Sequence, residues 1–349
     1  NATVFSSADL TARIDSNTVT GSGPVSFIAQ NGIQLGFGAA GSIRNNAISN
    51  ISYVPSTAVA CGILLYQSAG PDTASSNVLT GCQMGIYYID VGGLISENII
   101  NSTAVNTGTT SYWGIDADPG GAPRVTSQPY DAETFSRKSK NLLDNSSSIA
   151  TSIYRNVLTS DGTNGTGIEM DALGTETLIA TASENKVNGW DAGIYFYKDA
   201  GATLNGVAND NDLSGNVYAL FNQSGVMQNG TCNWYGTTVL ATIQSMISGT
   251  FNSAPYLTNG TDNDGPTIGF QPVPASCNGL PSSVINIKVI PQGFYNTATE
   301  RLNMRDTVRA YLHSNISPYP VLDSSTAVID SVTFEGSFTF TQPNGTYYI

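Results

Sequence analysis

Apolar and polar side chains alternate in short segments of this chain, and each of these segments begins with a Gly-Ile pair. The pair stands at residues 32–33, 62–63, 85–86, 114–115, 167–168 and 193–194, with a related Ala-Leu at 219–220. The residue two positions after each isoleucine is mostly apolar, whereas its neighbours are polar or aromatic. Alternation with a period of two predicts a β-strand that buries one face. Successive pairs are mostly 23 to 30 residues apart, which predicts one such strand per coil of a repeating fold.

A second motif, Ile-x-x-Asn, falls between these segments. It is read in IDSN (14–17), IRNN (43–46), ISEN (95–98) and IYRN (153–156). Asparagine tolerates left-handed backbone geometry and forms local hydrogen bonds, so we expect these residues at tight corners, with side chains that bond to the next coil. Two alternating strand signals predict a coil that climbs, and therefore an all-β parallel solenoid.

The composition fits an extracellular β-rich protein and narrows the possible partners. Charged residues make up 11% of the 349-residue chain, against about 25% in an average soluble protein. The net charge of −13 disfavours nucleic acid, because an acidic surface repels phosphate. The longest apolar runs, such as VINIKVI at 284–290, are far shorter than the roughly 18 residues of a membrane span, so we expect no span.

The stretch NGIQLGFGAAGSIRNNAIS (31–49) and the two repeats resemble right-handed parallel β-helix proteins of the pectin-lyase-like class, over residues 1–258. CNWYG (232–236) and the sequence after it are similar to the closing segment of secreted bacterial β-helix surface proteins. The resemblance implies a short capping helix that covers the open apolar end of the solenoid. Its apolar residues are Leu240, Ile243, Met246 and Ile247.

Beyond the solenoid, residues 259–281 are rich in Gly, Pro, Asn and Asp and predict a linker. The DNDG within it (262–265) resembles only the first part of a calcium loop, because the later glutamate is absent. Residues 282–349 predict short strands, and they resemble the immunoglobulin-like β-sandwich module of secreted bacterial surface proteins, which serves there for spacing or attachment. The strand at 346–349 is expected to continue in a longer chain or to pair at its edge with another chain.

The four cysteines are even in number and form no CxxC, which favours disulfides in an oxidising compartment over a metal site. Cys232 and Cys277 bracket the junction of solenoid and linker, so a disulfide between them is plausible. Cys61 and Cys82 lie on consecutive coils but are offset by two positions. They therefore form either a disulfide across an unfavourable distance or two buried free thiols.

Two strand segments, GIDAD (114–118) and GIEMD (167–171), place acids at both outward positions. If the 53 residues between them form two coils, the acid pairs lie about 9.6 Å apart, near the upper end of the inverting-glycosidase spacing. If residues 119–150 are an inserted arm, the acids lie within about 5 Å on adjacent coils, which suits a cation such as calcium. The candidate catalytic or metal-binding residues are Asp116, Asp118, Glu169 and Asp171.

Aromatic residues occupy outward positions on the coils that flank these acids. Rings stack on the apolar faces of sugars, and carboxylates accept hydrogen bonds from sugar hydroxyls. The pattern therefore predicts a glycan-binding face. Its candidate residues are Tyr66, Tyr87, Tyr195, Tyr197 and Phe221.

Three functions remain open. The first is a non-catalytic structural or adhesive protein of the bacterial cell surface, with a glycan or another copy of itself as partner. The second is a polysaccharide lyase or glycoside hydrolase that uses the outward acids. The single histidine, His313, lies outside the solenoid, and the Asn-Thr-Asp, Asp-Asp and Gly-His-Gly motifs usual in pectin-lyase-like hydrolases are absent. The third is a subunit of an extracellular fibre or surface layer, joined through the strand edge near residue 349.

Overall fold

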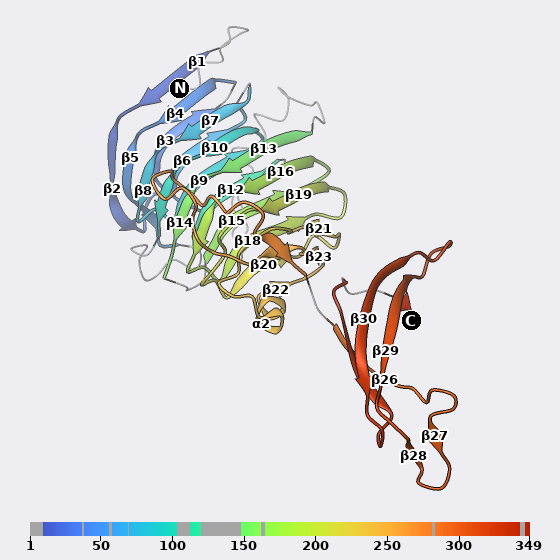
Figure 1. Cartoon of the computed structure of the whole chain (residues 1–349). Helices are drawn as coiled ribbons and strands as arrows, with labels where there is room; N and C mark the ends of the chain where they lie inside the picture. The colour runs from blue at the N-terminus through green and yellow to red at the C-terminus, as the bar shows by residue number, and fades with distance from the viewer. Residues whose placement is uncertain are drawn as a thin grey trace. The chain divides into compact units, whose positions relative to one another are not determined.

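The computed structural model describes residues 10–36, 38–55, 58–68, 70–102, 112–119, 148–161, 165–280, 283–342 and 346–349. It divides into two compact units, Asn1–Asn278 and Gly279–Ile349 (Figure 1). The first unit consists almost entirely of parallel β-strands, and the second of antiparallel strands. No helix in the described ranges has the length and apolar character needed to cross a membrane.

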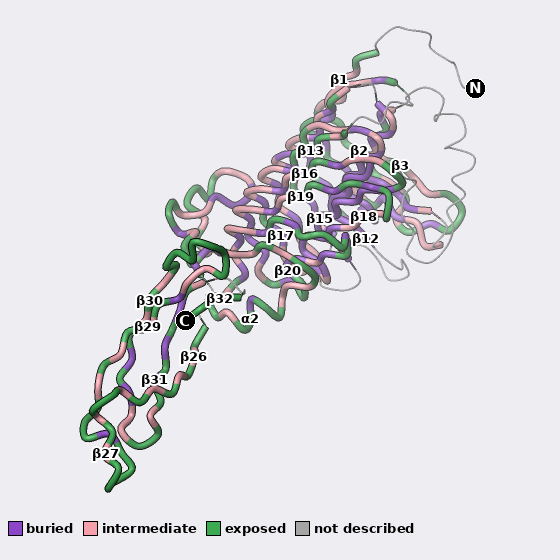
Figure 2. Tube along the Cα trace, turned by 90° about the vertical axis from the view of Figure 1, so that its right-hand side faces the viewer, coloured by how far each residue is buried: buried purple, intermediate pink, exposed green. Residues whose placement is uncertain are grey.

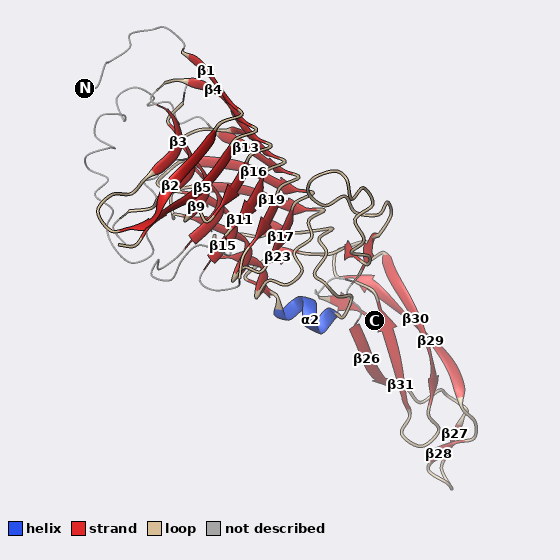
Figure 3. Ribbon diagram, turned by 90° about the vertical axis from the view of Figure 1, so that its left-hand side faces the viewer, coloured by secondary structure: helices blue, strands red, loops and turns tan. Residues whose placement is uncertain are grey.

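Three parallel sheets, here named A, B and C, run along the first unit (Figures 1 and 3). Each strand pairs with the strand at the same place in the coil before and after it, which is the topology of a parallel β-solenoid. Sheet A contains β1 (Thr11–Asp15), β4 (Ala40–Arg44), β7 (Asp72–Ser75), β10 (Gly93–Ser96), β13 (Ile149–Tyr154), β16 (Thr177–Ser183), β19 (Thr203–Asn209), β21 (Gln228–Asn229) and β23 (Phe251–Asn252). Sheet B contains β2 (Thr18–Val25), β5 (Ala47–Tyr53), β8 (Val78–Thr80), β11 (Ile99–Asn101), β14 (Val157–Thr159) and β17 (Lys186–Asn188). Sheet C contains β3 (Asn31–Gly36), β6 (Cys61–Tyr66), β9 (Met84–Ile89), β12 (Tyr112–Asp118), β15 (Gly165–Ala172), β18 (Ala192–Lys198), β20 (Tyr218–Asn222) and β22 (Ile247–Ser248).

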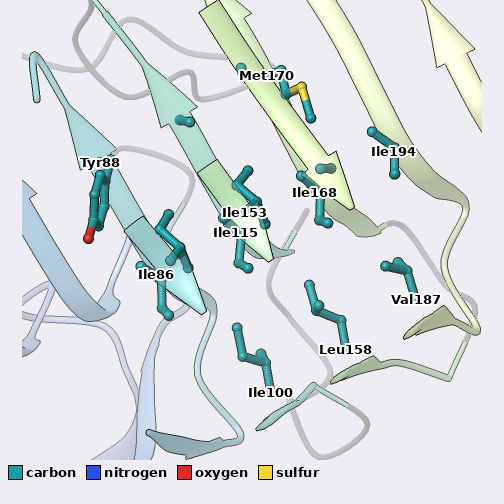
Figure 4. Close-up of a cluster of buried hydrophobic side chains, with 14 of the residues drawn as sticks. Ile86, Tyr88, Ile100, Ile115, Ile153, Leu158, Ile168, Met170, Val187 and Ile194 are labelled. Atoms are coloured by element: carbon teal, nitrogen blue, oxygen red, sulfur yellow. The ribbon is translucent and has the colours of Figure 1, made fainter. Parts of the chain in front are cut away.

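The predicted inward rows form the core between the sheets. Ile86, Ile115, Ile168 and Ile194 follow one another along sheet C, facing Ile100, Leu158 and Val187 of sheet B (Figure 4). The positions two residues after each isoleucine are also buried in this core, as the alternation predicted. They are Leu35, Leu65, Tyr88, Ala117, Met170 and Phe196.

The glycine of each Gly-Ile pair lies where a side chain would not fit. The pairing of β12 with β15 aligns Trp113 with Thr166 and Ile115 with Ile168 but skips the glycines between them. A Cβ on Gly114 would lie 2.5 Å from both the Gly167 carbonyl oxygen and a Leu158 methyl group. The glycine and the isoleucine therefore both turn toward the interior, which breaks the simple alternation once in every coil.

Eight asparagines, one per coil, stack along the corner between sheets A and B. Each of the first seven donates its backbone N–H and its Nδ2 to the Oδ1 of the asparagine in the next coil, at 2.9–3.1 Å. The last, Asn233, donates its Nδ2 to the carbonyl oxygens of Ala208 and Gly230. The left-handed residue is the one before each asparagine, with φ of 53–60°, and not the asparagine itself as the sequence predicted. The asparagine instead turns its side chain inward to bond along the stack. The stack comprises Asn17, Asn46, Asn77, Asn98, Asn156, Asn185, Asn211 and Asn233.

The 53-residue step between GIDAD and GIEMD is a single coil. Strand β12 pairs directly with β15 in sheet C, and β10 pairs directly with β13 in sheet A. No strand of an additional coil separates them in either sheet. Most of the residues that lengthen this coil, 120–147, lie outside the described ranges.

A short helix lies in the segment where a capping helix was expected. Helix α2 (Leu240–Ser245) buries Ile243, and Leu240 and Met246 pack against the core. Ile247 was expected on the helix, but it begins β22 and pairs with Leu220 of β20. The last coil therefore adds a strand to sheet C immediately after the helix.

Residues 258–278, here called the strap, belong to the first unit although most of them were expected to form a linker. Phe270 is 1% exposed, and its backbone N–H donates to the Glu184 carbonyl oxygen at 2.8 Å. A disulfide joins Cys277 to Cys232, whereas Cys61 and Cys82 are free and buried. The strap is therefore packed on the coils, although its polar composition is typical of a linker. Strand β24 (Tyr256–Leu257) precedes the strap, and β25 (Cys277–Gly279) begins at the end of the strap and pairs with β24.

The second unit contains small antiparallel sheets around one apolar core. Strand β26 (Ser283–Lys288) pairs with β31 (Glu335–Phe340), and β29 (Asp306–Ser314) lies between β30 (Val321–Ile329) and β32 (Tyr347–Tyr348). A further hairpin is formed by β27 (Tyr295–Asn296) and β28 (Arg301–Leu302). Buried positions alternate along β31, as Figure 2 shows. The buried core consists of Leu302, Leu312, Ala327, Ile329, Phe338 and Phe340.

We expect Gly114→Ala to destabilise the solenoid by about 2–3 kcal/mol, because overpacking at a fixed backbone forces the neighbouring coil to move. Chemical denaturation of the full chain measures the loss. Gly265→Ala is the matched control, since a Cβ there meets nothing within 4 Å, and its effect should stay within about 0.5 kcal/mol. Equal effects of the two substitutions would contradict the steric explanation of the Gly-Ile repeat.

Asn98→Ala is expected to cost about 3 kcal/mol or more, because it leaves several buried backbone and amide groups without partners. The lost bonds include those to Asn77, Asn156 and the Ala74 carbonyl. The exposed Asn31 of β3 is the control, and its alanine variant should unfold at nearly the wild-type denaturant concentration. A small effect of Asn98→Ala would show that the asparagine stack does not stabilise the coils.

Candidate functional site

The candidate site lies on the outer face of sheet C. Because the chain turns inward twice at each Gly-Ile pair, each coil presents three outward positions: before the glycine, after the isoleucine, and two residues further on. In β12 these are Trp113, Asp116 and Asp118, and in β15 they are Thr166, Glu169 and Asp171. The alternation in the sequence predicted only the second and third of these positions as outward. The same repeat marks the first position once the glycine is placed inside.

In the earlier coils this outer face forms a second apolar core. Tyr87 is fully buried and Tyr66 is 9% exposed. Both tyrosines were predicted to contact glycans, but they pack within this outer apolar cluster and offer little surface to a ligand. The outer apolar cluster comprises Val59, Cys61, Leu64, Tyr66, Met84, Tyr87, Ile89 and Trp113.

The four acids lie together beside this cluster. Asp116 is aligned with Glu169 in the sheet, and two residues further on Asp118 reaches the level of Asp171. Adjacent strands are about 4.8 Å apart, so the wider inverting-glycosidase spacing does not occur. All four side chains are at most 4% exposed. The sequence placed them on the correct face, but it did not reveal their burial.

Tyr87 connects the outer apolar cluster to the acids. Its hydroxyl donates to Asp118 Oδ2 at 3.2 Å in a buried hydrogen bond. Burial raises the pKa of the Tyr87 phenol well above its ordinary value, and the negative charges of Asp118, Asp116 and Asp171 raise that pKa further. Burial, followed by the charge of Asp116, also raises the pKa of the Cys61 thiol. Tyr87 is therefore a neutral hydrogen-bond donor at physiological pH.

The described residues include no group of three or more His, Cys, Asp or Glu arranged to hold a metal ion. Calcium at the four acids stays a prediction. Arg155, which lies near the acids in sequence, is engaged at the corner between sheets A and B. Its Nε donates to Glu184 Oε2 at 2.7 Å, and its guanidinium lies 4.7 Å from the centroid of the Tyr154 ring. The other nearby basic residues, Arg124, Arg137, Lys138 and Lys140, lie outside the described ranges.

Aromatic side chains reach the surface on the last full coils of sheet C. Phe221 stacks on Tyr195 of the preceding coil and on Tyr218 of its own strand, with ring centroids 5.3 Å apart in each case. Tyr197 lies 6.5 Å from Tyr195 between centroids. We call Tyr195, Tyr197, Tyr218 and Phe221 the aromatic strip. Tyr218, which is 40% exposed, was not among the predicted residues because it occupies the first outward position.

Polar groups fix the rings of the aromatic strip. The Tyr195 hydroxyl donates to Gln223 Oε1 at 2.7 Å, and the Tyr197 hydroxyl donates to Asp199 Oδ1 at 3.0 Å. Gln223 is exposed, whereas Asp199 and the neighbouring Lys198 are partly exposed. Tyr195 is only 9% exposed and supports Phe221 by stacking. The surface thus combines the exposed Tyr218 and the partly exposed Tyr197 and Phe221 with amide, carboxylate and ammonium groups. Such a surface suits binding of a polar ligand with apolar faces.

No family model matches this chain, and no curated protein or solved structure matches it either.

Tyr87→Phe should destabilise the protein by about 1–3 kcal/mol, because a buried carboxylate loses a hydrogen-bond donor while the ring is retained. Tyr197→Phe is the matched control. It also removes a bond from tyrosine to aspartate, but at a partly exposed site, so its cost should be below about 1 kcal/mol. Denaturant titration at neutral pH compares the two variants. Equal losses would show that burial does not strengthen the Tyr87–Asp118 contact.

Proposed function

We propose that this chain is a non-catalytic protein of the bacterial cell surface, and that its aromatic strip binds a neutral glycan. The fold would then be a right-handed β-helix of the pectin-lyase-like class, with a β-sandwich module for spacing or attachment. The observation that carries the proposal is the stack in which the exposed Tyr218 and the partly exposed Phe221 lie against each other. The buried Tyr195 supports Phe221 from the preceding coil, and its hydroxyl is bonded to Gln223.

The chemistry of the aromatic strip favours a sugar over other ligands. Ring faces and edges contact the C–H groups of a pyranose, and the neighbouring amide and carboxylate groups bind hydroxyls. The net charge of −13 disfavours a uronate or sulfated chain, since repulsion opposes its approach. A neutral polysaccharide is therefore the ligand class we infer.

The arrangement of the acids supports binding over catalysis. A glycosidase acid must reach the glycosidic oxygen within hydrogen-bond distance. Asp116 and Asp171 are 3% and 1% exposed, and the phenol of Tyr87 donates to their neighbour Asp118. The only histidine lies in the second unit, where its Nδ1 is 2.9 Å from the Tyr319 carbonyl oxygen.

An extracellular location is supported by the disulfide between Cys232 and Cys277, since such bonds persist in oxidising compartments. This bond also ties the strap to the final coils. A surface protein needs such resistance to local opening at the end of a solenoid, where one neighbour is missing.

The test is binding of the full chain to a panel of neutral and acidic polysaccharides, followed by calorimetry on any ligand found. Tyr218→Ala and Phe221→Ala should each weaken binding by about two- to tenfold, the range expected from loss of one aromatic contact. Tyr295→Ala in the second unit is the matched control, because Tyr295 is also 40% exposed, and it should bind like the wild type.

Three results would contradict this function. The first is that no polysaccharide binds, and the second is that Tyr295→Ala weakens binding as much as Tyr218→Ala. The third is release of reducing ends or unsaturated products that is lost in Asp116→Asn and Asp171→Asn, which would establish an enzyme instead.

A further inference from the structure

Strand β26 forms an open edge of the second unit. It pairs with β31 along its whole length, from Ser283 opposite Phe340 to Lys288 opposite Glu335. On its other side no strand pairs with it in the part of the chain that the structure describes. Alternate N–H and C=O groups of an antiparallel edge point away from the sheet, so β26 offers a row of backbone groups to a further strand.

The sequence of β26 lacks the features that usually protect such an edge. It contains no proline, its register with β31 shows no bulge, and its only charge is at the last position. That charge, Lys288, lies 3.5 Å from Glu335 of the neighbouring strand. The inward residues Ile285 and Ile287 pack against the core of the second unit but remain only partly buried.

The residues of β26 are complementary to a second copy of the same strand. In an antiparallel pair centred on Asn286, Ile285 lies opposite Ile287 of the second copy, and each pair of isoleucines covers the exposed part of the other. On the outer side, Val284 lies opposite Lys288 of the second copy, so no like charges face each other. The long methylene stem of the lysine packs against the valine. Val284 is 63% exposed in the single chain.

We propose that two copies of this protein associate through their β26 strands, antiparallel about a two-fold axis, so that the sheet runs β31–β26–β26–β31. A two-fold pair is closed and uses the same surface on both copies. The edge of β29 is less suitable, because β32 already pairs with it at His313 and Ser314. The partner is therefore a second copy of this chain, and the association is independent of whether the aromatic strip binds glycans.

The test uses the sign of a charge at one position. Val284→Lys places lysine opposite Lys288 of the second copy at two symmetric sites, whereas Val284→Glu places an opposite charge there. Analytical ultracentrifugation of the full chain should show a concentration-dependent dimer for the wild type. The dissociation constant should rise about five- to tenfold for Val284→Lys and stay equal or fall for Val284→Glu. High salt should reduce the difference between the variants.

Val328→Lys is the matched control, because Val328 is 57% exposed and its strand, β30, belongs to a different sheet from β26. It should dimerise like the wild type. The proposal is overturned if the wild type stays monomeric up to about 1 mM, the concentration at which even a weak specific contact populates the dimer. It is also overturned if the two Val284 variants shift the dissociation constant equally, or if Val328→Lys weakens the dimer as much as Val284→Lys.

Discussion

The spacing of about 4.8 Å between neighbouring coils is the constraint on which the rest of the first unit depends. At this distance the coils leave no room for water between them, so a buried polar group on the corner must bond to the coil above or below. Asn98 shows how fully the constraint is met, since its side chain accepts two bonds from Asn77 and donates to Asn156 and to the Ala74 carbonyl. The same spacing excludes a side chain at Gly114, which faces the carbonyl of Gly167. The Gly-Ile and Ile-x-x-Asn repeats of the sequence therefore both follow from the spacing between coils.

The constraint also explains how far the sequence predicts the structure. The repeats of Gly-Ile and Ile-x-x-Asn predict the sheets and the inward residues, because these positions depend on neighbours one coil away. Whether an outward side chain is buried or exposed does not follow from the repeats, because it depends on whether residues far away in the chain cover the outer face. Tyr87 and Tyr195 occupy equivalent positions and have similar chemistry, yet Tyr87 packs within the outer apolar cluster, whereas Tyr195 stacks on the partly exposed Phe221. Periodicity alone does not distinguish them.

The four acids also show that periodicity does not predict burial on the outer face. Their parity predicts that Asp116 and Glu169 face outward, and their alignment on adjacent strands follows from the single long coil between them. Their burial was not predictable from the pattern, because a strand's alternation separates the two faces of a sheet and says nothing of what lies beyond the outer one. For the strap, composition led to a wrong prediction of a linker. Its Gly, Pro, Asn and Asp residues are typical of a linker, but Phe270 and the disulfide at Cys277 hold it on the coils.

The long connection between β12 and β13 has a consequence for how such a protein can evolve. Other connections from sheet C to sheet A are short, such as residues 90–92 between β9 and β10, whereas this one spans residues 119–148. The coils on both sides nevertheless keep the same register. The entropy of closing a loop grows only slowly with its length, so a solenoid corner accepts added residues at small cost in stability. This corner is thus a place where new surface can be acquired or grafted without redesign of the scaffold.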